Sequence, residues 1–278
     1  MQDAFAYCAE LVRAADRDRY LAALFAPSCH RDALHALYAF NIEVARVRDA
    51  APQALAGEIR LQWWMDVLRG ERPGEASANP VAAALLAALE RYDLASDTLI
   101  DLIDAHRFDL YDEPMARLAD LEAYAGRTSS ALFALAAQIL AGSGQDAVTV
   151  PAGKAYATAA LLHAFPLHAA RHQLYVPVEL LERYGVRTAD VFAGRASAGL
   201  DAALAELRTF ARGHLHAVRA CIAELPTEAL PALLPTATVR SALDRLEQSQ
   251  AFSPDELALW RRQWLIWRAA HNPARIAN

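Results

Sequence analysis

Hydrophobic residues recur at three- and four-residue spacing along most of the chain. Ile59, Trp63 and Val67 illustrate the pattern, because this spacing places three large apolar side chains on one side of a helix. The period matches one face of an α-helix, whereas the alternating β-branched runs typical of strands are few. The pattern therefore predicts an all-α protein.

Proline, glycine and serine mark the predicted ends of the helices. Examples occur at residues 26–28, 72–74, 79–80 and 253–254, and these residue types stop or cap helices. The breaks divide the chain into about ten helices joined by short loops. No segment is long and polar enough to be an interdomain linker, and no repeat of fixed period is found. Residues 1–278 are therefore predicted to form a single domain.

The composition is that of an ordinary globular protein, with 278 residues, 55% of them hydrophobic, and a net charge of −6. The arginines are scattered among carboxylates, so nucleic acid is not an expected partner. Cys8, Cys29 and Cys221 lie far apart, which indicates reduced thiols in a cytosolic compartment. Neither a signal peptide nor an apolar run of roughly 20 residues is found. We expect a cytoplasmic protein that is at most peripherally associated with the inner face of the cytoplasmic membrane.

Several segments occur in an order that resembles a known protein family. They are RYLAALFAP (19–27), ALHALYAFNIEVARVRDA (33–50), IRLQWWMDVLRGE (59–71), LIDAHRFDLYDEPM (102–115), LEAYAGRTSSALFALA (121–136) and LYVPVELL (174–181). Together they make the chain similar to the squalene/phytoene synthase family, over residues 15–250. The resemblance implies the single-domain, all-α isoprenoid synthase fold.

The resemblance also implies where the chemistry of active family members would lie. In those proteins two facing helices each present an aspartate-rich motif, and acids four residues apart share one helix face. The carboxylates hold Mg²⁺ ions that bind a prenyl diphosphate and stabilise the departing pyrophosphate.

The first of these motifs is mostly absent from this chain. When it is aligned on the shared ALYAF, the usual pair of adjacent acids falls on Ala45 and Arg46, and only the last acid remains, as Asp49. One carboxylate cannot collect a trinuclear cluster of hard, strongly hydrated cations, each of which needs octahedral oxygen geometry.

The second motif, aligned on the shared LYVP, is also degenerate. The expected arginine falls on His163, and the two acids four residues apart fall on Ala164 and His168. Of the four principal aspartates, paired four residues apart in the two motifs, the three expected at Ala45, Ala164 and His168 are missing and only Asp49 remains. We predict that standard prenyl-diphosphate coupling is lost.

We therefore predict a degenerate ligand pocket with no catalytic residue, no metal site and no Mg²⁺ cofactor. Its residues are the altered motif positions and the neighbours that the family retains: Tyr38, Phe40, Ala45, Arg46, Asp49, His163, Ala164, His168, Arg171 and Tyr175.

The stretch FPLHAARHQLYVP (165–177) is most similar to a divergent branch of the family, which includes a mitochondrial assembly factor for respiratory complex I. This resemblance implies a non-catalytic, membrane-associated binding or assembly role. The implied partner is a membrane or respiratory-complex protein, and the implied ligand is a prenyl chain or a lipid. The alternative is a prenyltransferase acting on prenyl diphosphates, which would use Mg²⁺ and chemistry rebuilt around Asp49, the arginines and the histidines.

Other polar residues near the motifs have competing interpretations. His168 and His172 could bind Zn²⁺ from one helix face, but no further ligand is evident to complete a tetrahedral site. Arg46 and Arg48 could bind an anion, although pairing with nearby acids is favoured.

A run of acids at Asp101, Asp104 and Asp109 could be mistaken for a displaced metal site. Charge runs of this kind are usually solvated, and basic residues follow within the next turn. We predict an ion-paired helix face exposed to solvent.

Near the C-terminus, Leu257, Trp260, Trp264 and Trp267 form one apolar stripe of a helix, and arginines lie largely off the stripe. Such a helix suits the edge of a protein core or the interface of an anionic membrane. The core is favoured, because a terminal amphipathic helix normally closes a bundle. Peripheral membrane contact through this helix is the alternative.

Overall fold

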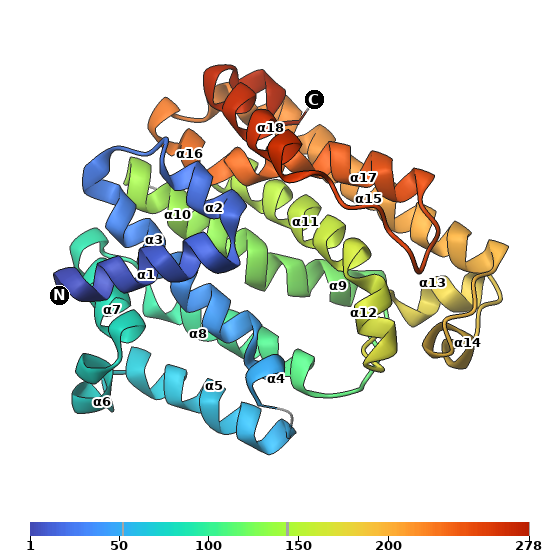
Figure 1. Ribbon diagram of the computed structural model, residues 1–278, viewed down its shortest axis with the longest axis horizontal. Helices are drawn as coiled ribbons and strands as arrows, with labels where there is room; N and C mark the ends of the chain where they lie inside the picture. The colour runs from blue at the N-terminus through green and yellow to red at the C-terminus, as the bar shows by residue number, and fades with distance from the viewer. Residues whose placement is uncertain (52, 143–144, 278) are drawn as a thin grey trace.

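The computed structural model describes residues 1–51, 53–142 and 145–277, and within these ranges the chain folds into helices with no β-strand (Figure 1). The prediction of an all-α fold is confirmed. No helix of the described chain combines the length and the apolar character needed to cross a bilayer.

The helices are shorter and more numerous than the sequence pattern predicts. In chain order the α-helices are α1 (Gln2–Ala15), α2 (Arg17–Ala23), α3 (Ser28–Ala45), α4 (Val47–Ala50), α5 (Ala54–Leu68), α6 (Pro73–Ala78), α7 (Pro80–Tyr92), α8 (Ser96–His106), α9 (Leu118–Ala125), α10 (Ala131–Ala141), α11 (Asp146–His163), α12 (Phe165–Ala170), α13 (Val178–Arg183), α14 (Thr188–Phe192), α15 (Ala198–Cys221), α16 (Leu230–Leu233), α17 (Val239–Gln248) and α18 (Leu259–His271). Short segments η1 (Arg107–Leu110) and η2 (Gly126–Ser130) join some of them.

The estimate of about ten helices is wrong because some continuous periodic segments break in the structure. α3 ends at Ala45, and the backbone of Arg46 leaves helical geometry before α4 begins. α11 ends at His163, and Pro166 lies in the first turn of α12. Proline has no N–H for a helical hydrogen bond and clashes with the preceding turn, so it favours a new helix at this point.

The helices that end at the two motifs, α3 and α11, both pack against α10 in the core. α10 contacts both α3 and α11, and α11 also packs along α15 and α17. Phe40 of α3 and Trp64 of α5 are fully buried in the larger apolar cluster, with their rings edge to face at 5.0 Å. Because α10 contacts both helices, α3 and α11 belong to one packed core.

Small residues allow α11 to approach η2 closely. A Cβ atom on Gly153 would lie 2.3 Å from the Cα atom of Ser130, so only glycine fits there. The Ser130 hydroxyl donates a hydrogen bond to the carbonyl oxygen of Val150 at 2.7 Å. Ser130 is thus part of the packing that sets the position of α11.

Candidate functional site

The altered motif positions lie where α3 and α11 end. Ala45 closes α3, Arg46 links α3 to α4, and Asp49 lies in α4, with all three exposed. His163 closes α11, and Ala164 links it to α12. Each motif is therefore interrupted by a helix break at one of its acid positions, at Arg46 in the first motif and at Ala164 in the second.

Asp49 is bound by an arginine from the second motif region. Its Oδ1 atom lies 2.6 Å from Nη1 of Arg171, which follows α12. The guanidinium group thus neutralises the single acid that the first motif retains.

Arg48 makes a second connection between the same segments. Its guanidinium donates to the main-chain oxygens of Asp109 at 3.0 Å and Arg171 at 3.2 Å. It also pairs with the carboxylate of Asp112 at 2.6 Å. Arg48 was expected to pair with a nearby acid, and it pairs with one from the chain after η1.

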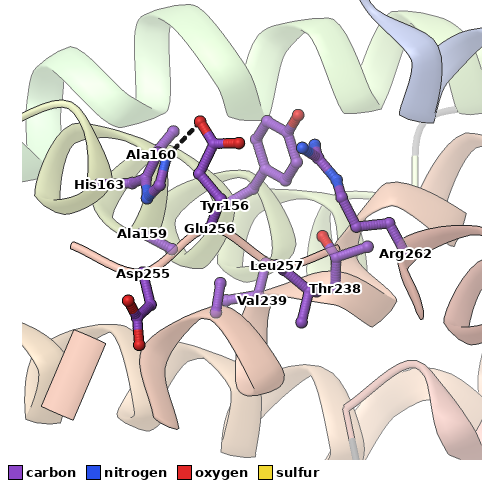
Figure 2. Close-up of a pocket in the computed structure, with 11 residues that line it drawn as sticks. Tyr156, Ala159, Ala160, His163, Thr238, Val239, Asp255, Glu256, Leu257 and Arg262 are labelled. Carbon is purple, nitrogen blue, oxygen red and sulfur yellow. Dashed lines mark ion pairs between the residues drawn. The ribbon is translucent and has the colours of Figure 1, made fainter. Parts of the chain in front are cut away.

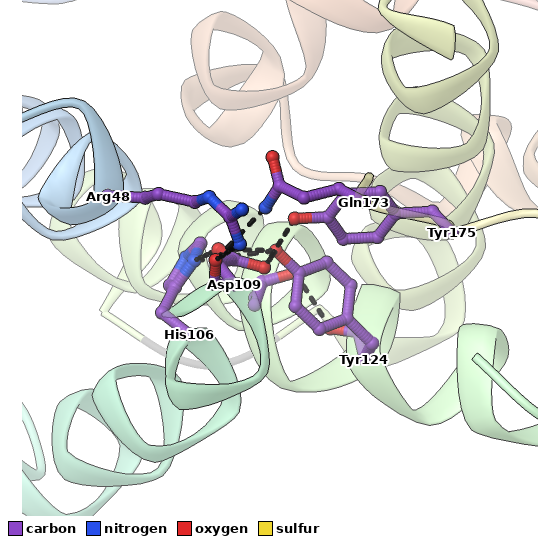
Figure 3. A network of polar contacts seen from close by, with 7 residues as sticks. Arg48, His106, Asp109, Tyr124, Gln173 and Tyr175 are labelled. Atoms are coloured by element: carbon purple, nitrogen blue, oxygen red, sulfur yellow. Dashed lines mark hydrogen bonds and ion pairs between the residues drawn. The ribbon is translucent and has the colours of Figure 1, made fainter. Parts of the chain in front are cut away.

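A buried polar network lies beside these arginine contacts (Figure 3). The carboxylate of Asp109, only 5% exposed, accepts hydrogen bonds from the hydroxyls of Tyr175 at 2.6 Å and Tyr124 at 3.0 Å. His106 lies 2.6 Å away through Nδ1, and Gln173 donates to the Asp109 main-chain oxygen at 3.0 Å. The network joins the end of α8 to α9 and to the chain after α12.

The prediction of a solvated acidic face is wrong for Asp109. Asp101 is exposed, and Asp104 pairs with Arg127 at 2.6 Å, as expected for such a face. The α8 helix ends at His106, however, and the turn of η1 carries Asp109 inward. Sequence periodicity assumes a continuous helix and so missed this change of direction.

Burial determines the protonation of the groups around Asp109. Desolvation and the Asp109 charge raise the pKa values of Tyr124 and Tyr175 well above 10, so both hydroxyls remain hydrogen-bond donors. The His168 ring lies 4.6 Å from the Tyr175 ring, and burial lowers the pKa of His168 to about 4. A neutral imidazole therefore stands at this position of the second motif at neutral pH.

A cavity of about 200 Å³ lies on the α11 side of the site (Figure 2). Ala160 and His163 line it together with the segment that leads into α18, including Glu256 and Leu257. The Nε2 atom of His163 is 3.9 Å from the Glu256 carboxylate. Asp255 and Glu256 are not among the predicted pocket residues, because they carry no recognisable motif. Leu257, predicted to begin the apolar stripe of the C-terminal helix, instead precedes α18 and lines this cavity.

The ten predicted pocket residues do not all line one cavity. The structure brings together Asp49 with Arg171, and His168 with Tyr175. Tyr38 and Phe40 are buried in the core, and the Tyr38 ring lies 5.7 Å from the Arg19 guanidinium. Exposed Arg46 reaches the main-chain oxygen of Ala15 at 3.5 Å.

The sequence does contain a signal for the missed residue Asp109. It stands between Phe108 and Leu110, two large apolar residues that favour burial of this turn, and an Asp that is buried must be paired.

The model of the family described as squalene/phytoene synthase matches residues 12–268. The chain belongs to the squalene/phytoene synthase family. This match confirms the family resemblance that was inferred from the order of the motifs along the sequence.

Proteins with sequences similar to this chain include both assembly factors and a synthase. "NADH dehydrogenase (ubiquinone) complex I, assembly factor 6" of Rattus norvegicus is 30% identical over 249 residues, which cover 88% of this chain and 74% of the relative. The Homo sapiens protein of the same name is 28% identical, covering 87% and 73%. A phytoene synthase of Thermus thermophilus is 29% identical over 230 residues, covering 77% and 76%.

Solved structures of the squalene/phytoene synthase family confirm the isoprenoid synthase fold. A dehydrosqualene synthase superposes with a TM-score of 0.82 at 18% identity, covering 97% of this chain and 96% of that chain. Squalene synthase HpnC from Alicyclobacillus acidocaldarius gives 0.74 at 21% identity, covering 91% and 96%.

For a member of the squalene/phytoene synthase family, the motif positions of this chain do not fit a magnesium cluster. Ala45, Arg46 and Ala164 supply no carboxylate, and Asp49 is already bound by Arg171. Within the described ranges, no group of three or more His, Cys, Asp or Glu side chains is placed to hold a metal ion.

His168 and His172, for which zinc binding was the less favoured interpretation, make separate aromatic contacts. His168 packs against Tyr175, whereas His172 packs against Phe192 with ring centroids 4.8 Å apart. The arrangement favours packing roles for both imidazoles.

Proposed function

We propose that this protein is a non-catalytic binding and assembly factor for a respiratory complex of the complex I type. The observation that carries the proposal is the ion pair between Asp49 and Arg171. Asp49 is the single carboxylate left at the first motif and its partner is a guanidinium group, whereas a cluster of Mg²⁺ ions needs several oxygen ligands in nearly octahedral geometry. The family fold is retained while the groups that perform the family's chemistry are replaced.

The relatives named as complex I assembly factor 6 support this choice of partner. They match most of this chain and about three quarters of their own length. A partner in a respiratory complex would place the protein in the cytoplasm, at the inner face of the membrane that holds the complex. The proposal includes no requirement for Mg²⁺ or another cofactor.

The alternative is a prenyltransferase of the squalene, phytoene or hopanoid type. Its support is the 29% identity to a phytoene synthase. An enzyme of this kind would have to act without the usual acids, so the two functions differ in their dependence on Asp49.

An assay of pyrophosphate release separates the two functions. Purified protein is incubated with farnesyl or geranylgeranyl diphosphate and Mg²⁺, and we expect release to stay at the background of a protein-free reaction. Release above background that disappears in Asp49→Ala would establish the prenyltransferase instead.

A complementation experiment tests the assembly role directly. Deleting the gene should lower the NADH:quinone oxidoreductase activity of isolated membranes, and the wild-type protein should restore it. Asp49→Ala should restore the activity equally well, with exposed Asp101→Ala as the matched control. Unchanged activity in the deletion strain would contradict the assembly role.

A further inference from the structure

The outer face of α18 exposes an unusual set of aromatic side chains. The core face of the helix consists of three buried residues, Leu265, Ile266 and Ala269. The outer face carries three tryptophans with exposed fractions of 70%, 47% and 53%, namely Trp260, Trp264 and Trp267. The expectation that the tryptophan stripe closes the core is wrong, because the adjacent aliphatic face packs inward instead.

Aromatic contacts extend this face beyond α18. His271 packs against Trp267 at 4.5 Å, and Phe25, which follows α2, packs edge to face against His271 at 6.3 Å. Phe25 and its neighbour Leu24 are 40% and 42% exposed. We call the set formed by these residues and the tryptophans the tryptophan surface: Leu24, Phe25, Trp260, Trp264, Trp267 and His271.

The C-terminal segment that carries the tryptophans is cationic, although the protein as a whole is acidic. Residues 257–278 contain four of the 27 basic residues and none of the 33 acids. Arg268 lies 4.5 Å over the Trp264 ring, and exposed Arg261 forms no ion pair within the described chain. The remaining residues, 1–256, therefore carry a net charge of −10, from 23 basic and 33 acidic residues.

Arg262 does not contribute to this cationic surface. Its guanidinium turns inward and binds the carboxylate of Asp18, which is 1% exposed, at 2.6 Å. The positive charge offered to a partner comes from Arg261 and Arg268, next to the exposed indoles.

We propose that the tryptophan surface docks on the anionic lipid headgroups of a membrane. Indole rings favour the headgroup region, because each presents an apolar body and one N–H donor, and nearby arginines gain from lipid phosphates. α18 lies at the edge of the molecule (Figure 1), and the exposed fractions of its tryptophans leave the tryptophan surface open to a partner. The inference deepens the proposed function, on which it rests for the biological choice of a membrane.

Co-sedimentation of the full chain with vesicles tests the docking. We expect binding to phosphatidylglycerol vesicles at low salt, weaker binding at 0.5 M salt, and little binding to pure phosphatidylcholine. Arg261→Gln should weaken the binding about fivefold, since an arginine near such a surface contributes about 1 kcal/mol. The double variant Trp260→Ser/Trp267→Ser should weaken it roughly tenfold or more.

A matched control removes exposed apolar side chains from another part of the molecule. Leu55 and Ile59 of α5 are 73% and 64% exposed, and Leu55→Ser/Ile59→Ser should bind vesicles like the wild type. Circular dichroism of each variant checks that the fold is kept. Brominated lipids should quench the wild-type fluorescence more than that of the tryptophan double variant.

Two results would overturn the docking. One is a wild-type protein that stays in the supernatant with anionic vesicles at low salt. This result would show that the tryptophan surface does not bind lipid and would favour a protein partner instead. The other is a folded tryptophan variant that binds like the wild type. Either result would leave complementation of the deletion strain unaffected, so it is distinguishable from failure of the assembly role.

Discussion

Asp49 and Arg171 are 122 residues apart in the chain and form an ion pair of 2.6 Å. The pair joins the retained acid of the first degenerate motif to a retained arginine after the second. Both side chains are about half exposed, so the pair stabilises the fold by less than about 1 kcal/mol. Its main consequence is chemical, because it holds together two segments that Mg²⁺ and diphosphate would bridge in an active relative.

Magnesium and diphosphate should therefore leave the melting temperature unchanged. A ligand that binds only the folded state raises stability in proportion to its occupancy, so an intact site would shift the melting temperature at millimolar Mg²⁺. Differential scanning fluorimetry with Mg²⁺ and pyrophosphate, against an EDTA control, measures the effect. A rise of several degrees that Asp49→Ala abolishes would contradict this expectation.

Restoring acids to the motif positions should cost stability, and the cost should concentrate at one position. Ala45 and Arg46 are exposed, so Ala45→Asp and Arg46→Asp should each change the free energy of unfolding by less than about 0.5 kcal/mol. His168 is largely buried near Asp109, and His168→Asp should cost about 1–3 kcal/mol through desolvation and like-charge repulsion.

Urea unfolding without metal measures the cost of each substitution. Ala164→Asp completes the set, and the fourfold variant should be less stable than the wild type. A fourfold variant as stable as the wild type would show that the site tolerates a full set of acids.

His168 should also make stability depend on pH. Its pKa falls from an ordinary value of 6.5 to about 4 in the folded protein, because burial disfavours the charged ring. Between these values the unfolded chain binds a proton that the folded chain does not, so stability is present above pH 6.5 and falls toward pH 4. The loss has an upper limit of about 3 kcal/mol.

Melting temperatures of wild type and His168→Gln at pH 7.5 and pH 5 test this dependence. Other buried histidines contribute in both proteins, so the difference between them isolates His168. We expect a smaller loss on acidification in the variant, and equal losses would rule out the assigned role.

The sequence predicts the fold class, the family and the loss of the motif acids, because these depend on residue identities and on spacing over one or two turns. The sequence does not predict which side chains contact one another where active family members would bind metal. The Asp49 pair needs Arg171, and the Asp109 network needs Tyr175, and both contacts join residues far apart in the chain. Periodicity also cannot decide which of two apolar faces of α18 packs inward, since Trp264 and Leu265 lie one position apart.

Removal of the Asp109 carboxylate should destabilise the fold strongly. Asp109→Ala leaves the buried Tyr175 hydroxyl and the partly buried Tyr124 hydroxyl without their acceptor, and we expect a loss of about 3 kcal/mol in the free energy of unfolding. Chemical denaturation followed by circular dichroism measures it, with exposed Asp101→Ala as the control, expected to stay within about 0.5 kcal/mol. If both variants were equally stable, the network would have no structural role.

Two neighbouring arginines of α18 should differ in their effect on stability: Arg262 should stabilise the fold, whereas Arg261 should contribute only surface charge. Arg262→Glu removes the partner of buried Asp18 and places a second acid beside it, and burial already raises the pKa of that carboxyl group. Because Arg262 is itself partly exposed, we expect a loss of about 2–3 kcal/mol, somewhat below that of a fully buried pair. Arg261→Glu is the matched control, since Arg261 is exposed and should change stability by less than about 0.5 kcal/mol.

Thermal unfolding of the two variants, measured side by side, decides between these roles. If Arg262→Glu is the less stable of the two, vesicle binding should be tested with variants of Arg261 only, because these leave the fold intact. Equal stability of Arg262→Glu and Arg261→Glu would mean that the contact with Asp18 does not anchor α18 to α2, and the inward assignment of Arg262 would fail.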